Sequence, residues 1–176
     1  EKQIKDTRES MFLVAQYAAD FFKKNLWETQ EGKSIGLTYF KERGFEDETL
    51  KKFALGYSPE LYDALSKKAQ NEGFKLDFLE KTGLVIVNED RKVDRFRGRV
   101  IFPIRSMSGR VQGFGARILS QNSKTAKYLN SPESDIYNKS KALYGIFESK
   151  QSIAKKDLCF LVEGYTDAIQ MHQSGI

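Results

Sequence analysis

The first half of the chain is patterned as a series of amphipathic helices. Glu9 stands three residues after Asp6, as in a capping box, and apolar residues then recur at helical spacing. This stripe consists of Met11, Val14, Ala15, Ala18, Phe21 and Phe22. The pattern predicts a long helix that begins near Asp6 and packs into a core. Further helices are predicted at 33–43, 47–53, 61–72 and 76–82, with Gly44, Gly73 and Gly83 at helix ends.

From Leu84 onwards the pattern is that of strands. Residues 84–87 and 99–119 favour β-branched and aromatic side chains in alternation, and the turn residues 106–109 divide the second stretch into 99–105 and 110–119. An antiparallel hairpin is therefore predicted. Pro103 has no amide hydrogen to donate, so we expect its strand at a sheet edge or with a bulge. A polar loop is expected at 120–125, and a short helical piece among the turn residues of 127–144.

The last part of the chain has the pattern of a strand followed by a helix. The apolar run 157–162 predicts a buried strand, residues 163–164 a tight turn, and 166–174 a helix. One such βα unit cannot cover both of its faces. The fold class is therefore α/β, with a mixed unit of helices and antiparallel sheet over 1–150 and the start of a second domain over 151–176.

Composition and charge narrow the class of protein. Hydrophobic residues make up 40% of the 176 residues and charged residues 30%, which is typical of a folded globular domain. The net charge of +5 permits a polyanionic partner without proving one. The single cysteine, Cys159, excludes a disulfide framework and a cysteine zinc cluster in this chain, and indicates a reducing, cytoplasmic compartment. No apolar stretch approaches the roughly 18 residues of a membrane span.

The predicted hairpin strand 110–119 carries glycines next to an arginine on one face. Alternation places Val111, Gly113, Gly115, Arg117 and Leu119 on that face. A guanidinium beside bare glycine backbone suits a phosphate or a stacked base. A bent strand with a solvated arginine explains the same residues.

Basic and aromatic residues are interleaved around the turn at 130–132. Lysines can follow the phosphates of a single nucleic-acid strand while tyrosine rings stack on its bases. A solvated loop whose tyrosines pack inward is the alternative. The residues are Lys127, Lys139 and Lys141 with Tyr128, Tyr137 and Tyr144.

Four arginines lie close together just before and within the first hairpin strand. In an extended strand Arg95, Arg97, Arg99 and Arg105 would share one side, opposite Phe96, Val100, Phe102 and Ile104. Such a stripe is either a binding surface or the exposed face of an amphipathic strand that pairs in part with Asp94.

The sequence EGYTD at 163–167 places two carboxylates where the predicted strand ends. In open α/β sheets this edge is where ligands bind. Glu163 and Asp167 could hold Mg²⁺, which prefers oxygen ligands, although two carboxylates are too few for a two-metal site. Asp167 could equally be an acid favoured at a helix N-terminus, with Glu163 an exposed residue. We assign no role to His172.

Taken together, these segments match the bacterial replicative primases of the DnaG family in order and spacing over nearly the whole chain. The set is more specific than any one of its motifs. The matching text is YFKERG from Tyr39, FALGYSP from Phe53, DRFR from Asp94, RVIFPI from Arg99, GFGAR from Gly113, KYLNSPE from Lys127, LYG from Leu143 and VEGYTD from Val162.

The resemblance implies a mixed subdomain followed by the first βα unit of a Toprim domain, a Rossmann-like metal-binding fold. It implies synthesis of short RNA primers from ribonucleotides on single-stranded DNA, with Mg²⁺ or Mn²⁺ as cofactor, in the bacterial cytoplasm at the replication fork. Such primases bind zinc in an N-terminal domain and a replicative helicase through a C-terminal domain. We expect both domains to lie outside this chain.

The resemblance also implies roles for individual residues. Glu163 and Asp167 are expected to be catalytic carboxylates and metal ligands, in a site completed by an Asp-x-Asp motif beyond this chain. Four residues are expected to line the groove for template and nucleotide: Arg43, Arg117, Lys127 and Lys139. To these we add, from the basic and aromatic patterns and the matched segments, Arg95, Arg97, Tyr128, Asn130 and Ser131.

Two other classes of function stay open. A different Toprim protein, such as a topoisomerase, a recombination mediator or an old-type nuclease, shares the EGYTD-like element but gives no reason for residues 99–132. A noncatalytic single-strand-binding module explains the basic loop and leaves the two carboxylates unexplained. Catalysis is expected of the parent protein rather than of this chain alone.

Overall fold

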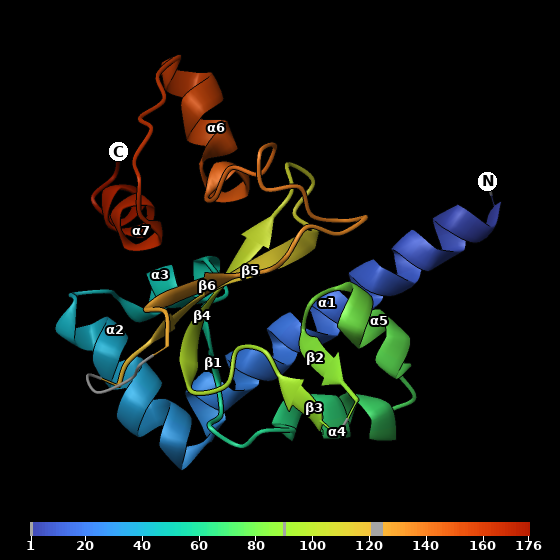
Figure 1. The fold of residues 1–176 in the computed structure, drawn as a ribbon. Coiled ribbons are helices and arrows are strands. Elements are labelled where there is room, and N and C mark those ends of the chain that lie inside the picture. Colours follow the sequence, from blue (N-terminus) through green and yellow to red (C-terminus); the bar gives the residue numbers. More distant parts are fainter. Residues whose placement is uncertain (1, 90, 121–124) are drawn as a thin grey trace.

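A four-stranded antiparallel sheet lies at the centre of the molecule, in a computed structural model that describes residues 2–89, 91–120 and 125–176 (Figure 1). The strand order is β1-β4-β5-β6, and a separate hairpin pairs β2 with β3. The strands are β1 Gly56–Ser58, β2 Val85–Asn88, β3 Arg91–Asp94, β4 Arg99–Arg105, β5 Val111–Ile118 and β6 Tyr128–Asn130. The predicted class, helices with an antiparallel sheet, is confirmed. The predicted loop at 120–125 lies mostly outside the described residues.

Helices pack on both faces of this sheet, with α1 on one face and α2 and α7 on the other. They are α1 Lys2–Glu28, a π-helical turn Gly32–Leu37, α2 Thr38–Glu42, α3 Asp47–Lys52, α4 Ala64–Asn71, α5 Leu76–Lys81, α6 Ile146–Lys156 and α7 Tyr165–Gln173. The four short predicted helices are present, although the one at 33–43 is divided between the π-helical turn and α2. Gly44, Gly73 and Gly83 end helices with φ of 78°, 93° and 70°, as predicted. None of the helices described is both long and apolar enough to cross a membrane.

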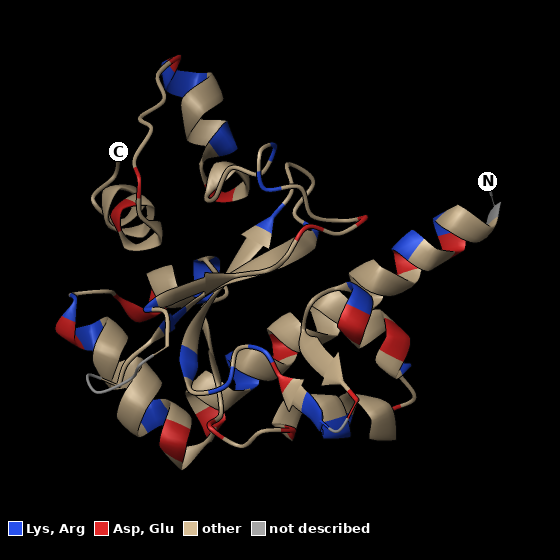
Figure 2. Cartoon of the chain, in the orientation of Figure 1, with Lys and Arg blue, Asp and Glu red and all other residues tan. Residues whose placement is uncertain are grey.

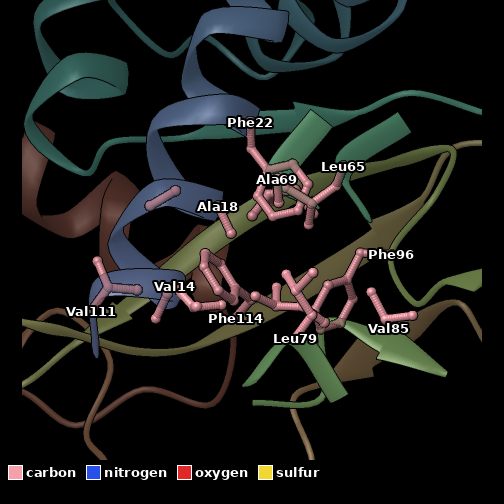
Figure 3. Close-up of a cluster of buried hydrophobic side chains, with 14 of the residues drawn as sticks. Val14, Ala18, Phe22, Leu65, Ala69, Leu79, Val85, Phe96, Val111 and Phe114 are labelled. Atoms are coloured by element: carbon pink, nitrogen blue, oxygen red, sulfur yellow. The ribbon is translucent and has the colours of Figure 1, made fainter. Parts of the chain in front are cut away.

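The predicted stripe of α1 packs into the larger of two apolar clusters (Figure 3). Val14, Ala18 and Phe22 are buried there, and the Phe22 ring meets Phe114 of β5 edge-on at 5.5 Å. Complete burial of a larger side chain such as Val14 or Phe22 contributes roughly 1.5–3 kcal/mol. The cluster is closed by Leu65, Ala69, Leu79, Val85 and Phe96 from α4, α5 and the β2–β3 region.

The predicted start of α1 is wrong. The helix begins at Lys2, so Asp6 lies inside it and its carbonyl accepts a hydrogen bond from the Ser10 hydroxyl at 2.9 Å. Residues 2–5 contain no glycine or proline, and lysine and glutamine favour helix, so the helix extends past the apparent capping box.

The predicted hairpin is confirmed as β4 and β5. Pro103 has a partner on one side only, because β1 pairs with residues 99–101, and the register shifts between Ile104 and Arg105. Both features accommodate the missing proline donor. The shift also turns Val111 into the larger cluster, so its predicted place on the same face as Gly113 is wrong.

The predicted stripe of four arginines is also wrong. Residues 95–98 form the turn between β3 and β4 instead of an extended strand. Arg99 is buried, and its guanidinium donates hydrogen bonds to the Lys127 carbonyl at 3.2 Å and to the Thr125 hydroxyl at 3.3 Å. It ties β4 to the start of β6.

The C-terminal part was predicted least well. Residues 127–144 contain β6, turns and irregular backbone rather than the expected helical piece, and α6, which follows them, was not anticipated. Residues 157–162 form no strand, and Leu161 is 79% exposed. A strand needs a neighbour to bond with, and none of the strands described pairs with this segment. The helix predicted after it is confirmed as α7, and the expected boundary at residue 150 falls within α6.

Candidate functional site

The two glycines of β5 lie beneath tyrosine rings. A Cβ atom on Gly115 would stand 2.3 Å from the Tyr165 ring, and one on Gly113 would stand 3.0 Å from the Tyr137 ring. The low face predicted from the sequence is therefore present. The close approach that the glycines allow is made by side chains of this chain itself.

Tyr165 attaches the start of α7 to the sheet. Its ring stacks on Phe102 of β4 with centroids 5.1 Å apart and planes 9° apart, and it meets Tyr144 edge-on at 4.7 Å. Its hydroxyl donates a hydrogen bond to Asn130 Oδ1 at 2.6 Å. Burial raises the pKa of Tyr165, so the hydroxyl keeps the proton that it donates.

The other end of α7 is held by Gln173. Its side-chain amide donates to the Gly44 carbonyl at 2.8 Å, and its amide oxygen accepts the Glu46 N–H at 2.9 Å. Between the two ends Ile169 is fully buried in the second apolar cluster. Contacts at both ends and in the middle therefore fix α7 on the sheet, next to the loop that follows Arg43.

Glu163 and Asp167 are both exposed at the N-terminal end of α7. A Cβ on Gly164 would lie 2.7 Å from Asp167 Oδ2, so this carboxylate lies against the Gly164 backbone, one residue after Glu163. Carboxylate oxygens are the donors that Mg²⁺ prefers. Within the described ranges no three His, Cys, Asp or Glu side chains come together. The pair thus fits a magnesium or manganese ion in donor type, and a complete ligand set would need further donors.

Two arginines face one tyrosine near the sheet, and the Tyr128 ring next to Arg117 lies 6.4 Å from the Tyr165 ring at the start of α7. The guanidinium carbon of Arg43 lies 4.6 Å from the centroid of the Tyr39 ring, and that of Arg117 lies 4.8 Å from it. Arg117 is also 5.8 Å from the ring of Tyr128, which is 42% exposed. The structure thus brings together three residues that the sequence singled out, with Tyr39 between them.

The charges of this cluster are not neutralised internally. None of the ion pairs among the described residues includes Arg43 or Arg117. The Arg117 Nε and the Tyr39 hydroxyl are buried without a hydrogen-bond partner. Burial raises the pKa of Tyr39 although both arginines oppose the shift, so the phenol stays neutral. Donors and positive charge without acceptors suit an anionic ligand.

Two predicted lysines lie next to β6 and in the loop after it. Lys127 is exposed immediately before Tyr128, and Lys139 is exposed with its backbone N–H bonded to Glu133 at 2.8 Å. A cavity of about 620 Å³ lies between α6, residues 157–164 and α7. Its lining includes Asn130, Lys139 and Glu163. The cavity therefore connects β6 and its loop with the turn that carries Glu163 and Asp167, called the carboxylate turn below.

Three other predicted binding residues either lie away from the arginine cluster or already form hydrogen bonds within the chain. Arg95 is half-buried and donates from Nε to the Gly83 carbonyl, and burial lowers its pKa. Arg97 is exposed on the turn before β4, and no contact given by the structure joins it to Arg117. Ser131 is buried, and its hydroxyl accepts the Phe114 N–H at 2.9 Å. Their part in binding stays a prediction.

Sequence reasoning missed two kinds of residue here. Tyr39 and Tyr165 lie inside quoted motifs, but their partners are far away in sequence and periodicity could not pair them. The second kind is a buried ion pair, Arg105 with Glu148, with Nη2 and Oε1 3.0 Å apart. Burial raises the pKa of Glu148, although Arg105 opposes this. This pair holds α6 against β4.

Net charge does not mark the site. Figure 2 shows basic and acidic residues interspersed along α1 and on α2. The positive character comes from a local cluster without carboxylate partners, which a whole-chain charge of +5 could not have revealed.

Residues 21–150 match the family model for the DNA primase catalytic core, N-terminal domain. The chain is similar to the DNA primase of Halalkalibacterium halodurans, at 38% identity over 98% of this chain and 29% of that protein. It is similar in structure to the RNA polymerase domain of Mycobacterium tuberculosis DnaG, with a TM-score of 0.89 and 37% identity over 96% of this chain and 54% of that one. A DnaG primase catalytic domain bound to single-stranded DNA gives a TM-score of 0.88 at 34% identity, over 97% and 52% of the two chains. The chain thus spans less than a third of that curated relative's length.

Proposed function

This chain belongs to the DNA primase catalytic core family, as its N-terminal domain, and on that premise we propose that it is part of an enzyme that makes short RNA primers on single-stranded DNA. The reaction is metal-dependent nucleotidyl transfer. The observation that carries the proposal is the position of Arg43, Tyr39 and Arg117 beside an α7 that presents Glu163 and Asp167.

The arginine cluster, which consists of Arg43, Tyr39 and Arg117, would bind the nucleic-acid backbone. Arg117 and Arg43 offer N–H donors and charge to phosphate oxygens, and the exposed ring of Tyr128 offers a stacking surface for a base. Lys127 and Lys139 extend the positive charge along β6 and its loop. A solved DnaG catalytic domain similar to this chain is bound to single-stranded DNA, which supports this assignment.

The carboxylate turn would hold the metal. When bound, a divalent ion supplies charge stabilisation at the reacting phosphate oxygens. Glu163 and Asp167 provide negative charge and oxygen donors for it, and Tyr165 between them holds the turn against the sheet. Further ligands would come from water or from the rest of the enzyme. We include in the proposal Mg²⁺ or Mn²⁺ as cofactor, ribonucleotides as substrates, a replicative helicase as partner and the bacterial cytoplasm as compartment.

A noncatalytic single-strand-binding function is the second candidate for this chain by itself, because the arginine cluster lies wholly within it while the metal ligands are few. Other Toprim enzymes are not favoured. The family match extends over 21–150 and so includes residues 99–132, which the resemblance to a topoisomerase or nuclease does not explain.

The substitution Glu163→Gln tests the catalytic proposal in a primase of the relatives' length that carries this sequence. Primer synthesis should fall by about 100-fold or more, because charge stabilisation at the reacting group is lost. Single-strand affinity should change little, because the arginine cluster is intact. Glu80→Gln, the same chemical change on the exposed surface of α5, is the control. Full synthesis by Glu163→Gln would remove Glu163 from the mechanism, and joint loss of binding and synthesis would indicate a folding role.

A further inference from the structure

Tyr165 touches two strands at one register position. Gly115 of β5 and Asn130 of β6 are paired residues in the sheet. The Tyr165 ring covers Gly115, and its hydroxyl bonds to Asn130 at 2.6 Å. One residue further along the same pair of strands lies Leu129 with Ala116, and the next pair is Tyr128 with Arg117. A single side chain of α7 thus bridges the strands that carry the arginine cluster.

Tyr165 also lies between the two carboxylates in the sequence. Leu161, shortly before it, is 79% exposed, and no strand among the described residues holds the segment 157–162. At this end of α7 the position of the turn that carries Glu163 and Asp167 is therefore set by the ring of Tyr165 and by its hydroxyl, whereas Ile169 and Gln173 hold the rest of the helix. The ring sets the distance from the sheet by stacking on Phe102. The hydroxyl sets the position of the turn along β6, because it bonds to one particular atom of that strand, Asn130 Oδ1.

We propose that Tyr165 is a positioning residue that couples the two halves of the site. Through its bond to Asn130, a divalent ion on Glu163 and Asp167 and a single strand on Arg117 and Tyr128 strengthen each other's binding. The inference rests on the proposed function. It adds to it a reciprocal dependence of metal affinity and DNA affinity.

Packing alone is the competing explanation for Tyr165. The variant Tyr165→Phe separates the two, because it keeps the ring over Gly115 and removes only the hydroxyl. Tyr57→Phe is the matched control. It removes a tyrosine hydroxyl that donates to Glu31 at 2.9 Å, in the same apolar cluster, and Glu31 belongs to neither α7 nor β6.

The test measures DNA affinity with and without metal in a primase of the relatives' length that carries this sequence. The probe is a fluorescein-labelled oligothymidylate, titrated in Mn²⁺ and in EDTA at equal ionic strength. In the unsubstituted protein and in Tyr57→Phe, Mn²⁺ should lower the dissociation constant by about fivefold or more. In Tyr165→Phe the change should be under about twofold, with unchanged affinity in EDTA. Mn²⁺ affinity from electron paramagnetic resonance, with and without the oligonucleotide, should show the same pattern.

Asn130→Ala removes the same hydrogen bond from the acceptor side. It should lose the coupling as Tyr165→Phe does, and the double variant should lose no more than either single one. Equal coupling in Tyr165→Phe and Tyr57→Phe would overturn the inference and leave the proposed function standing. If the unsubstituted protein bound the oligonucleotide neither in Mn²⁺ nor in EDTA, both this inference and the proposed function would be overturned.

Discussion

The two faces of the β4–β5 hairpin are built from neighbouring residues but are filled in different ways. On one face Ile101, Phe114 and Ala116 are buried against α1 and the short helices by apolar contacts alone. On the other, Gly115 lies beneath Tyr165, and Arg117 has a buried Nε without a partner. The first face gains its stability from burial. The second keeps a guanidinium donor that has no partner within this chain, and such exceptions are expected at functional sites.

The largest effect is expected on the apolar face, from Phe114→Ala. The ring is 1% exposed and contacts Phe22 and Phe96, so its removal leaves a cavity between α1 and the sheet. We expect a loss of about 3–5 kcal/mol in the free energy of unfolding. Urea denaturation of this chain measures it. A loss below about 1 kcal/mol would contradict the view that this face holds the fold.

A smaller effect is expected on the other face, from an added methyl group. In Gly115→Ala the new Cβ would overlap the Tyr165 ring, so the tyrosine has to move at a cost of about 1–3 kcal/mol. Gly113→Ala is the matched variant, because its closest contact is at 3.0 Å and requires only a slight adjustment. Thermal unfolding of both should rank Gly115→Ala as the less stable. The reverse order would mean that Tyr165 is not seated on Gly115.

The smallest effect concerns pH and the packing of α7. Burial lowers the pKa of His172 below 6.5, with Lys52 adding to the shift, and the imidazole meets Phe53 edge-on at 5.2 Å. The unfolded chain therefore binds the proton more tightly. Stability from this group is complete above pH 6.5 and is lost as the pH falls towards the folded pKa. His172→Gln should flatten the fall in melting temperature between about pH 7 and 5.5. An identical fall in both proteins would remove His172 as its source.

The sequence predicted those parts of the fold that rest on local periodicity. The α1 stripe and the β4–β5 hairpin follow from side-chain spacing, because burial on one face selects that spacing. The strand at 157–162 failed because apolar content shows only that a segment can be buried, whereas pairing depends on which strands lie beside it. The arginine stripe failed because a turn at 95–98 breaks the alternation that the prediction assumed.

The candidate site divides in the same way. Arg117, Tyr128 and the carboxylates were singled out because their motifs bring reactive types together within a few residues. Tyr39 and Tyr165 were not, because each acts through partners on another element, namely Arg117 for one and Asn130 for the other. Ser131 shows the opposite case. Its place in the turn at 130–132 predicted a binding role, but its hydroxyl accepts a hydrogen bond from the Phe114 N–H.

The central claim is that the cluster of Arg43, Tyr39 and Arg117, extended by Lys127 and Lys139, binds a single nucleic-acid strand, and salt dependence tests it most directly. Fluorescence anisotropy would follow an oligothymidylate bound to this chain, to Arg117→Glu and to Arg91→Glu, a control with the same charge change on the exposed β3 strand. If four basic groups neutralise phosphates, log K against log[salt] should have a slope near −3, from roughly −0.7 for each contact. Arg117→Glu should bind more weakly with a slope near −2, and Arg91→Glu should match the unsubstituted chain. Affinity independent of salt, or equal losses in the two variants, would contradict the account.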